Sequence, residues 1–447
     1  SVGGVAGRLP MIPDRAFAEL EFCLRLLWQR PRPGPAAGSF DDRRGSIALH
    51  PRFQSPLHPD RRRILIASPY LPFPLSHGGA VRIWNLSQQL CREFDLLLVT
   101  FRERRDQVDY ERLASCFARV LVVDHDERRR PDHTVPAVVA QFRSRAMAAA
   151  LRQAAAEFQP DLLQIEYTQL AAYREVLPYL PAVLVEHDVT FSLYEQIWQA
   201  ERTPRARAEY DLWHRFESHW LGRYDAVALM SAPERDRAVA AGAPQARAWI
   251  VPNGVDTARF EPADAPPDPL PELLFVGSFR HRPNLLGFRH LEKEILPRLW
   301  RNFGDLRLRV VAGPEYEKYW KGPTDSRITV EGFVADLAPH YARAGVVLVP
   351  LVVSAGTNIK VMEALACGRP VVSTPIGCAG LDLVDGREAL IADGPEAFAA
   401  AVDRLLRDPD LRRRLGRQAR QAAVDRFSWE QAARRAVEMY RSLTPDP

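Results

Sequence analysis

The residues best suited to chemistry lie in the stretch from Ser354 to Gly377, which reads SAGTNIKVMEALACGRPVVSTPIG. It contains Lys360, one of only four lysines in a chain whose Lys and Arg residues together number 60. Lysine carries a compact point charge that suits a phosphate in a tight loop, whereas arginine presents a wide planar fork. A lysine at this position of an arginine-rich chain therefore suggests a phosphate ligand.

The elements around this lysine are predicted to be a strand, a loop and a helix. The strand covers GVVLVPL at 345–351, and the helix runs through NIKVMEALACG to its stop at Gly368. Gly356 lets the backbone approach a ligand closely, and Thr357 and Asn358 are candidate N-caps. Free N–H groups and the positive end of the helix dipole make such a helix start an anion site.

Lys360 falls in the first turn of that helix, where a cation is normally unfavourable. A bound diphosphate would offset this cost, because its negative charge would face both the dipole and the ammonium. Glu363 lies three residues further on and could accept hydrogen bonds from ribose hydroxyls. The alternative is that Lys360 and Glu363 form an ordinary ion pair across one helical turn.

Short runs of Val, Ile and Leu alternate with helical stretches from Arg63 onward, and a Pro-rich segment at 261–272 interrupts the series. Such runs are typical of parallel strands that helices cover on both faces. The predicted strands lie in RILIAS, FDLLLVTF, VLVVD, DLLQIEY, AVLVEHD, YDAVALMS and AWIVPNG, and then in ELLFVGS, LRLRVVAG, ITVEGF, GVVLVPL, PVVST and EALIAD. The sequence therefore predicts an α/β protein with two Rossmann-like, doubly wound parallel-sheet domains. Their ligand would bind in a central cleft, because open parallel sheets bind ligands outside the carboxyl ends of their strands.

The chain is predicted to have three parts. Residues 1–60 are an N-terminal extension in which RAFAELEFCLRLLWQR indicates an amphipathic helix, followed by a Pro- and Gly-rich linker. That helix could lie on an anionic membrane or pack on its own domain. Residues 61–260 form the first Rossmann-like domain and residues 261–447 the second. The last helices are broken at 427–429, and the final one is predicted to cross back to the first domain.

Composition argues against several classes of protein. A net charge of +4 over 447 residues is too mild to indicate nucleic acid binding. The five cysteines show no CxxC or His-partnered spacing, which favours free thiols in a reducing compartment. No apolar run approaches the roughly 18 to 20 residues of a transmembrane helix, and no signal peptide is recognised. The expected location is the cytoplasm, with peripheral contact at the inner membrane face through the N-terminal helix as an option.

The chain resembles a known family, the retaining GT-B glycosyltransferases of the family-4 type, whose donor-nucleotide loop is similar to GTNIKVMEALACGRPVVSTPIG. Further segments of that family resemble IVPNGVDTARF, LLFVGSFRHRPNLLGFRHL, ITVEGFVADLAPHYARAGVVLVP and DRFSWEQAARRAVEMY. Its glycine loop and first helix resemble PYLPFPLSHGGAVRIWNLSQQL, and its histidine segment resembles EHDVT. The resemblance extends over residues 63 to 443, and the C-terminal motifs are the more specific ones.

The resemblance implies roles for individual residues. Lys360, with Arg280 of the turn FRHRPN, would hold the donor diphosphate, and His187 would lie beside the transferred sugar. Backbone N–H groups at Gly78 and Gly79 would face the diphosphate and the acceptor. The implied catalytic set is His187, Lys360 and Arg280, and the implied donor-binding set is Gly78, Gly79, Gly356, Thr357, Asn358, Lys360 and Glu363. The resemblance implies neither a metal nor a cofactor, since the nucleoside-diphosphate sugar is a substrate.

One position departs from the family pattern, which often has a Glu eight residues before the ribose-binding one. Here that position is Ala355, so the donor hydroxyls would be read differently, for instance by backbone N–H groups of Gly356 and Thr357. The role implied for Arg280 could be shared by His281 and Arg282, which follow it directly.

Two acidic tripeptides mimic the DxD metal motif of the other large glycosyltransferase fold, GT-A. They are Asp124-His125-Asp126 and Asp408-Pro409-Asp410, and matches this short are common by chance, so no metal site is predicted. The chain has no GxGxxG after its first strand and no GxxxxGK[ST], which argues against a nicotinamide dehydrogenase and a P-loop enzyme. His187 follows the strand AVLV and is expected at a site, with a satisfied core histidine as the alternative.

The sequence thus predicts a retaining, metal-independent glycosyltransferase. It would move a sugar from a nucleoside-diphosphate sugar to a glycan or lipid-linked acceptor of cell-envelope polysaccharide assembly. Two alternatives remain, a nucleotide-sugar epimerase on the same fold and a non-catalytic protein that binds a sugar nucleotide or a glycan.

Overall fold

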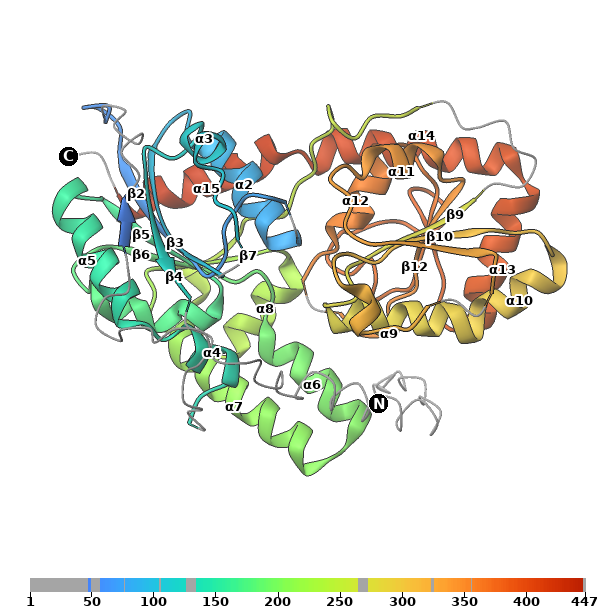
Figure 1. Ribbon diagram of the computed structural model, residues 1–447, viewed down its shortest axis with the longest axis horizontal. Coiled ribbons are helices and arrows are strands. Elements are labelled where there is room, and N and C mark those ends of the chain that lie inside the picture. The colour runs from blue at the N-terminus through green and yellow to red at the C-terminus, as the bar shows by residue number, and fades with distance from the viewer. Residues whose placement is uncertain are drawn as a thin grey trace, which may run out of the picture.

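The computed structural model shows two sheets side by side, each covered by helices on both faces (Figure 1). It describes residues 57–75, 77–103, 106–125, 134–263, 272–322, 325–354 and 356–444, and the backbone of 47–49. The amphipathic helix predicted within residues 1–60, most of the Pro-rich segment at 261–272, and Ala355 lie outside these residues. Both predicted Rossmann-like sheets are confirmed.

The first sheet has eight strands in the order β1-β4-β3-β2-β5-β6-β7-β8. All neighbours pair in parallel except β1, which pairs antiparallel with β4 at the edge. The strands are β1 (Ile47–Leu49), β2 (Arg63–Ser68), β3 (Asp95–Arg102), β4 (Arg119–Asp124), β5 (Leu162–Glu166), β6 (Ala182–Val185), β7 (Ala226–Leu229) and β8 (Ala248–Ile250). The edge strand β1 was not predicted, because its three residues fall in a stretch without apolar periodicity.

The second sheet has six parallel strands in the order β11-β10-β9-β12-β13-β14. They are β9 (Leu273–Val276), β10 (Leu308–Val311), β11 (Ile328–Glu331), β12 (Val346–Val349), β13 (Val371–Ser373) and β14 (Leu390–Ile391). Each lies within a run that the sequence predicts as a strand, because these runs are buried on both faces and therefore apolar throughout.

Helices connect the strands of the first half and cover both of its faces. They are α2 (Gly78–Leu90), α3 (Tyr110–Ala114), α4 (Ala137–Phe142), α5 (Arg145–Phe158), α6 (Thr190–Glu201), α7 (Pro204–Leu221) and α8 (Ala232–Ala240), with 3₁₀ turns at Thr168–Val176 and Gln245–Arg247. Helices α6 and α7 form a hairpin that projects from the body of the first half (Figure 1).

The helices of the second half follow the same scheme. They are α9 (Arg282–His290), continued by a π-helical turn at Leu291–Ile295 and by α10 (Leu296–Asn302), then a 3₁₀ turn at Tyr316–Lys318, α11 (Ala338–Arg343), α12 (Ile359–Ala366), α13 (Pro395–Arg407), α14 (Pro409–Arg426) and α15 (Trp429–Leu443). As predicted from the sequence, the strand, loop and helix around Lys360 are β12, its loop and α12.

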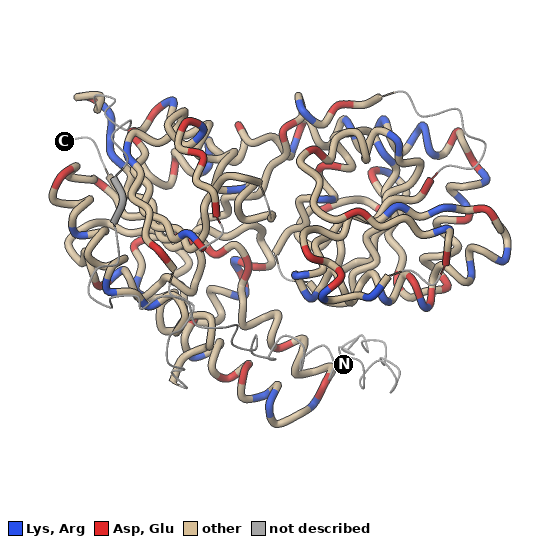
Figure 2. Tube along the Cα trace, in the orientation of Figure 1, with Lys and Arg blue, Asp and Glu red and all other residues tan. Residues whose placement is uncertain are grey.

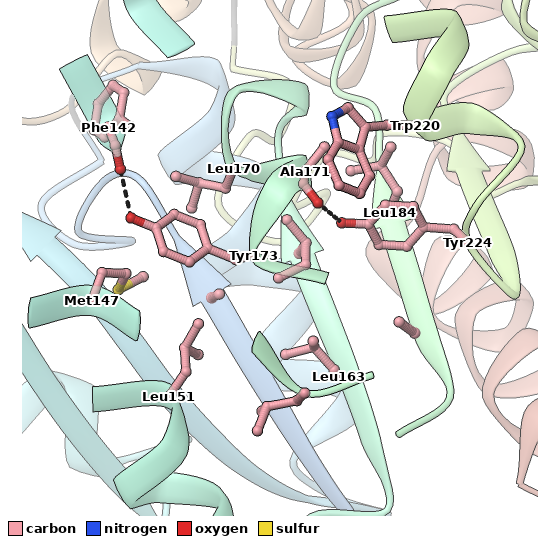
Figure 3. Close-up of a cluster of buried hydrophobic side chains, with 14 of the residues drawn as sticks. Phe142, Met147, Leu151, Leu163, Leu170, Ala171, Tyr173, Leu184, Trp220 and Tyr224 are labelled. Carbon is pink, nitrogen blue, oxygen red and sulfur yellow. Dashed lines mark hydrogen bonds between the residues drawn. The ribbon is translucent and has the colours of Figure 1, made fainter. Parts of the chain in front are cut away.

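Each sheet carries an apolar core on both faces. Figure 3 shows part of one such core, where Leu163 of the first sheet lies toward Leu151 of α5 and Leu184 lies beside Tyr224. Tyrosine hydroxyls within this core are paired with backbone carbonyls: Tyr224 donates to Ala171 at 2.7 Å. These cores hold the sheets rigid, so that the loops at the carboxyl ends of the strands have fixed starting points.

The chain passes between the two halves twice, and the two passages lie side by side. Val255, on the first passage, forms a bridge with Ser428 on the second, and the N–H of Val255 donates to the carbonyl of Phe427 at 2.7 Å. Beyond Ser428, α15 packs on α2 of the first half (Figure 1), where Trp429 and Tyr440 join the first half's core. The C-terminal helix therefore belongs structurally to the first half.

Charges of both signs are interspersed along both halves (Figure 2). Among the described residues, no helix combines the length and the apolar character that crossing a bilayer would require.

Candidate active site

The N-terminus of α12 points into the region between the halves. Asn358 is the N-cap residue by position, but its side chain does not cap the helix, which corrects one prediction. Its amide donates instead to the carbonyl of Gly377 at 2.9 Å, and Thr357 accepts a hydrogen bond from Asn253 at 2.8 Å. Neither predicted cap thus occupies the first N–H groups of α12, and these groups keep the capacity to bind an anion.

Lys360 is held in place by a residue of the second half that sequence reasoning missed. Its Nζ donates to Oδ1 of Asn284, at the start of α9, and lies 5.9 Å from the ring centroid of Phe275. Asn284 is buried, and its own amide donates to the carbonyl of Ser278 at 3.1 Å. Burial lowers the pKa of Lys360 to about 8, and the nearby charge of Glu363 opposes this shift. An anion beside the ammonium would favour its charged form.

Glu363 lies one turn deeper and is almost fully buried. Its Oε2 accepts a hydrogen bond from the hydroxyl of Tyr341 at 2.8 Å, and burial raises its pKa. The hydrogen-bond partners of Lys360 and Glu363 are therefore Asn284 and Tyr341, which disfavours a simple ion pair between the two. Glu363 also lines a small pocket between the halves, together with Leu75, Val81, Asn85, Gly254, Val255, Asp256, Arg259, Phe260, Val334, Ala335, Leu337, Ile359 and Trp429.

The N-terminus of α2 faces that of α12 across the interface. A Cβ at Gly78 would lie 3.7 Å from Cδ1 of Ile359, so the two helix starts are neighbours. A Cβ at Gly79 would fall 1.4 Å from the hydroxyl oxygen of Tyr167, so only glycine leaves room for that ring. Two helix N-termini that face one another concentrate positive potential between them.

His187 lies at the carboxyl end of β6, and its side chain is only 8% exposed. Its Nε2 lies 2.6 Å from Oε2 of Glu166, which ends the neighbouring strand β5. The ring of Tyr167 stacks on the imidazole with centroids 3.7 Å apart and planes 4° apart. Tyr167 adopts φ = 68°, a left-handed conformation that is costly for a residue with a side chain. The imidazole is therefore fixed from two sides.

The two halves are in close contact where Gly356 passes His187. Gly356 has φ = 69°, and a Cβ there would lie 2.9 Å from the carbonyl oxygen of His187. Two hydrogen bonds cross nearby, from Gln196 of α6 to the carbonyl of Ser354 at 3.1 Å and from Asn253 to Thr357. Glycine is thus required at position 356 for its backbone conformation and for close approach to the other half of the protein. The predicted approach to a ligand stays a prediction.

Buried carboxyl groups gather behind His187 in the first half. Glu217 of α7 accepts the N–H groups of Thr190 and Phe191 at 2.9 and 2.7 Å and so caps α6, and burial raises its pKa to about 8. Burial also raises the pKa of Glu186 well above its usual range and that of Glu234 to about 7. These carboxyl groups favour their neutral form near the interface, because water does not reach them.

The three basic residues of the turn predicted to contact the diphosphate differ in their exposure and contacts. Arg280 and His281 are exposed, whereas Arg282 is partly buried. Arg282 pairs with Glu201 of α6 at 2.7 Å, so its guanidinium is committed to a contact between the halves. Of the three candidates for a phosphate contact, Arg280 and His281 keep that role open and Arg282 does not.

The acidic tripeptides that were set aside have other surroundings. Asp408 caps α14 by accepting the N–H of Leu411 at 2.9 Å, and Asp410 pairs with Arg413. Asp124 pairs with Arg102 at 2.6 Å, and Asp126 lies outside the described residues. In the described ranges, no group of three His, Cys, Asp or Glu side chains is arranged to hold a metal ion.

Several site residues were not predicted, and one signal could have found some of them. Glu166 ends β5 and His187 follows β6, and these two strands are neighbours in the sheet, so the meeting of Glu166 with the predicted His187 at one sheet edge follows from the topology. Asn284 lies in the turn FRHRPN that was singled out for other residues. Tyr341 and Tyr440 carry no local signal, because only tertiary packing brings them to the site.

Two parallel α/β halves with opposed helix N-termini define the GT-B class of protein, and comparisons with known proteins agree. A model described as "Glycosyltransferase Family 4" matches residues 76–259, and one described as "Glycosyl transferases group 1" matches residues 270–408. The chain belongs to the family-4 type of GT-B glycosyltransferases, as the sequence resemblance predicted.

Relatives with curated names are glycosyltransferases. A D-inositol 3-phosphate glycosyltransferase of Kineococcus radiotolerans is 31% identical over 49% of this chain and 57% of its own length. A GDP-mannose-dependent alpha-(1-6)-phosphatidylinositol monomannoside mannosyltransferase of Mycolicibacterium smegmatis is 29% identical over 48% of this chain and 62% of its own length. The chain thus spans about three fifths of the length of these two relatives. It spans 26% of the length of another relative, from Corynebacterium urealyticum.

Solved structures share the fold. Sucrose-phosphate synthase from Thermosynechococcus elongatus superimposes with a TM-score of 0.67 at 20% identity, covering 86% of this chain and 99% of the other. HepE of Anabaena, solved in complex with UDP-glucose, gives a TM-score of 0.64 at 16% identity, covering 85% and 99%. At these identities the likeness concerns the fold alone.

Proposed function

We propose that the protein is a glycosyltransferase that moves a sugar from a nucleoside-diphosphate sugar to a glycan or lipid-linked acceptor. The observation that carries the proposal is the placement of Lys360 in the first turn of α12, beside uncapped N–H groups and opposite the glycine start of α2. A diphosphate placed there would meet an ammonium and two helix N-termini. Glu363, which lines the adjacent pocket, would then accept hydrogen bonds from the ribose.

The proposed reaction retains the configuration at the sugar's anomeric carbon. The bond between that carbon and the diphosphate oxygen breaks, and its electron pair stays on the diphosphate. The acceptor hydroxyl forms the new bond on the same face and gives its proton to the departing phosphate oxygen. Lys360 and the helix N-termini would stabilise the developing negative charge, and His187 would lie beside the transferred sugar. In this scheme neither a metal nor a cofactor takes part.

For the substrates, we propose only the chemical class. HepE of Anabaena was solved with UDP and with UDP-glucose. The names of the two curated relatives give GDP-mannose as the donor of one, and phosphatidylinositol monomannoside and D-inositol 3-phosphate as the inositol compounds. We infer that this chain uses a nucleoside-diphosphate sugar of this kind. The cytoplasmic location, the role in cell-envelope polysaccharide assembly and the membrane contact of residues 1–60 are also proposals.

The first experiment is a thermal-shift panel of UDP, GDP, dTDP, CMP, ADP and NAD on the wild type, on Lys360→Ala and on Lys318→Ala. Lys318 is exposed and pairs with Glu315, so it controls for loss of a positive charge. A nucleotide at one hundred times its dissociation constant should stabilise the protein by about 2.7 kcal/mol. We expect one nucleoside diphosphate to stabilise the wild type and Lys318→Ala but not Lys360→Ala.

Stabilisation by NAD alone, or by none of the six, would overturn the proposal. Once the donor base is known, the anomeric configuration of the product tests retention by NMR, and activity in excess EDTA tests metal independence. Co-sedimentation with anionic liposomes, with and without residues 1–60, tests the membrane contact.

A further inference from the structure

A chain of buried side chains leads from the C-terminal helix to His187. The hydroxyl of Tyr440, on α15, donates to Oε1 of Gln164 on β5. Nε2 of Gln164 donates to Oε1 of Glu166 at 2.6 Å, and Oε2 of Glu166 lies 2.6 Å from Nε2 of His187. Gln164 and Glu166 lie two residues apart on one strand, so their side chains share a face of the sheet.

The hydroxyl of Tyr440, at one end of this series of side chains, determines which group donates in each of its hydrogen bonds. Tyr440 is fully buried, and burial raises the pKa of its hydroxyl, so the group keeps its proton and donates. Gln164 accepts at its oxygen and must therefore turn its amide nitrogen toward Glu166. One oxygen of Glu166 thus already serves as an acceptor.

A buried cation lies near Glu166. Arg82 of α2 is fully buried; burial lowers its pKa to about 10, and the charge of Glu166 is the foremost influence that opposes this shift. The two groups are therefore close enough to attract one another electrostatically. A carboxylate is an acceptor only, so the proton between Glu166 and His187 belongs to Nε2 of the imidazole.

We propose that Glu166, oriented by Gln164 and Tyr440, is the positioning residue that holds His187 in the Nε2–H tautomer and leaves Nδ1 to act at the site. This inference rests on the proposed function for the meaning of His187, but the tautomer itself is a property of the free protein. The stacked ring of Tyr167 fixes the plane of the imidazole, and Glu166 fixes its rotation within that plane. The last helix of the chain would thus contribute to a site at the carboxyl edge of the first sheet.

Charged and titratable groups face His187 from three elements. Glu166 approaches from β5 and Asp188 from its own loop, and His77, at the start of α2, interacts with it electrostatically. Glu166 makes the 2.6 Å contact to the imidazole and is therefore the residue to substitute.

The test compares the wild type with Glu166→Gln, Tyr440→Phe and Tyr224→Phe in the full-length protein. Tyr224→Phe is the matched control, because its buried hydroxyl donates at 2.7 Å to the backbone carbonyl of Ala171 (Figure 3) and takes no part in the hydrogen-bonded series from Tyr440 to His187. Long-range ¹H–¹⁵N spectra of histidine-labelled protein, assigned with His187→Ala, report the tautomer directly. We expect Nε2–H in the wild type and in Tyr224→Phe, and loss of that preference in Glu166→Gln.

With a donor and acceptor in hand, Glu166→Gln should lower kcat by roughly 10- to 100-fold, as losses of groups that orient a functional ligand do. KM for the donor should stay within about twofold. Tyr440→Phe should lower kcat by a smaller factor. Tyr224→Phe should leave kcat unchanged, although it should lower the melting temperature about as much as Tyr440→Phe does. In the His187→Ala background, Glu166→Gln should have no further effect on kcat.

The two proposals fail in different ways. A protein that transfers no sugar contradicts the proposed function, while the tautomer spectra still decide the role of Glu166. The positioning role would be overturned by an Nδ1–H tautomer in the wild type or by an unchanged tautomer in Glu166→Gln. It would also be overturned if Glu166→Gln lowered kcat as much in the His187→Ala background as in the wild type.

Discussion

The two halves of this protein meet at one interface but build their shares of it in different ways. The second half contributes one short segment from Gly356 to Glu363, whose loop and helix start are set by neighbouring residues. The first half contributes Gly79, Glu166, Tyr167 and His187, which come from three separate segments, and it receives Tyr440 from α15. A site made from one segment can be read from a sequence, and a site made from many segments needs the fold.

The halves also differ in the charged groups that they place at the interface. In the second half, Lys360 is positive, lies at a helix N-terminus, and is held by the neutral amide of Asn284. In the first half, carboxyl groups are buried behind His187, and burial raises the pKa of Glu186, Glu217 and Glu234. The second half therefore presents a cation to the interface, while the carboxyl groups behind His187 in the first half are buried away from water.

The sharpest test of this contrast is Lys360→Ala. If Lys360 stabilises a departing diphosphate, kcat/KM should fall about 100- to 1000-fold, as it does when one electrostatic donor to a transition state is removed. Lys318→Ala, at an exposed pair in the same half, is the control and should stay near the wild type. A loss of less than about tenfold would remove Lys360 from the chemistry.

The second test concerns the buried carboxyl groups of the first half, through Glu234→Gln. Burial, followed by the charge of Asp188, raises the pKa of Glu234 from 4.5 to about 7. The unfolded chain releases this proton near pH 4.5 and the folded protein only near pH 7, so stability falls between these values as the pH rises. The wild type should lose up to about 3 kcal/mol relative to Glu234→Gln over that interval.

Urea unfolding at pH 4.5 to 8 measures this difference, and the exposed Glu438→Gln serves as the control. Parallel stability curves for the wild type and Glu234→Gln would show that Glu234 titrates normally and that water reaches its carboxyl group.

The third test, Gly356→Ala, addresses the contact between the halves. A Cβ there meets a left-handed φ of 69° and the carbonyl oxygen of His187 at 2.9 Å. Gly386→Ala is a matched control, since Gly386 has φ = 76° with no atom within 4 Å of its Cβ. Both variants should lose about 1–2 kcal/mol from backbone strain. Gly356→Ala alone should also lose activity, because the added atom pushes the halves apart. Equal activity in the two variants would contradict the close contact.

The smallest effect is expected from Tyr341→Phe, which removes the hydroxyl that donates to Glu363. The buried carboxylate loses one donor, and stability should fall by about 1 kcal/mol. Tyr224→Phe removes a comparable buried hydroxyl far from Glu363 and should cost a similar amount. Nucleotide affinity should weaken several-fold only in Tyr341→Phe. If affinity is unaffected, Glu363 is not the ribose ligand.

The sequence alone determined the strands of both sheets except β1, and it determined the loop and helix start that the second half contributes to the interface. The strands are apolar throughout because helices bury them on both faces, and Gly356, Lys360 and Glu363 take their places from the local turn and helix. The predicted N-cap at Asn358 was wrong in its side-chain contact, because a carbonyl from another loop, at Gly377, competes for the amide.

Only the tertiary structure decided which residues hold Lys360 and His187. Asn284 and Tyr341 reach α12 from other strand–helix units, and Tyr440 reaches Gln164 across 276 positions of the chain. The edge strand β1 and the α6–α7 hairpin, which carries Glu201 and Gln196 to the second half, likewise follow from packing. The physical reason is the range of the forces involved. Periodicity and turn chemistry act over a few neighbouring residues, whereas a buried polar group takes whichever partner the packed fold brings within hydrogen-bonding distance.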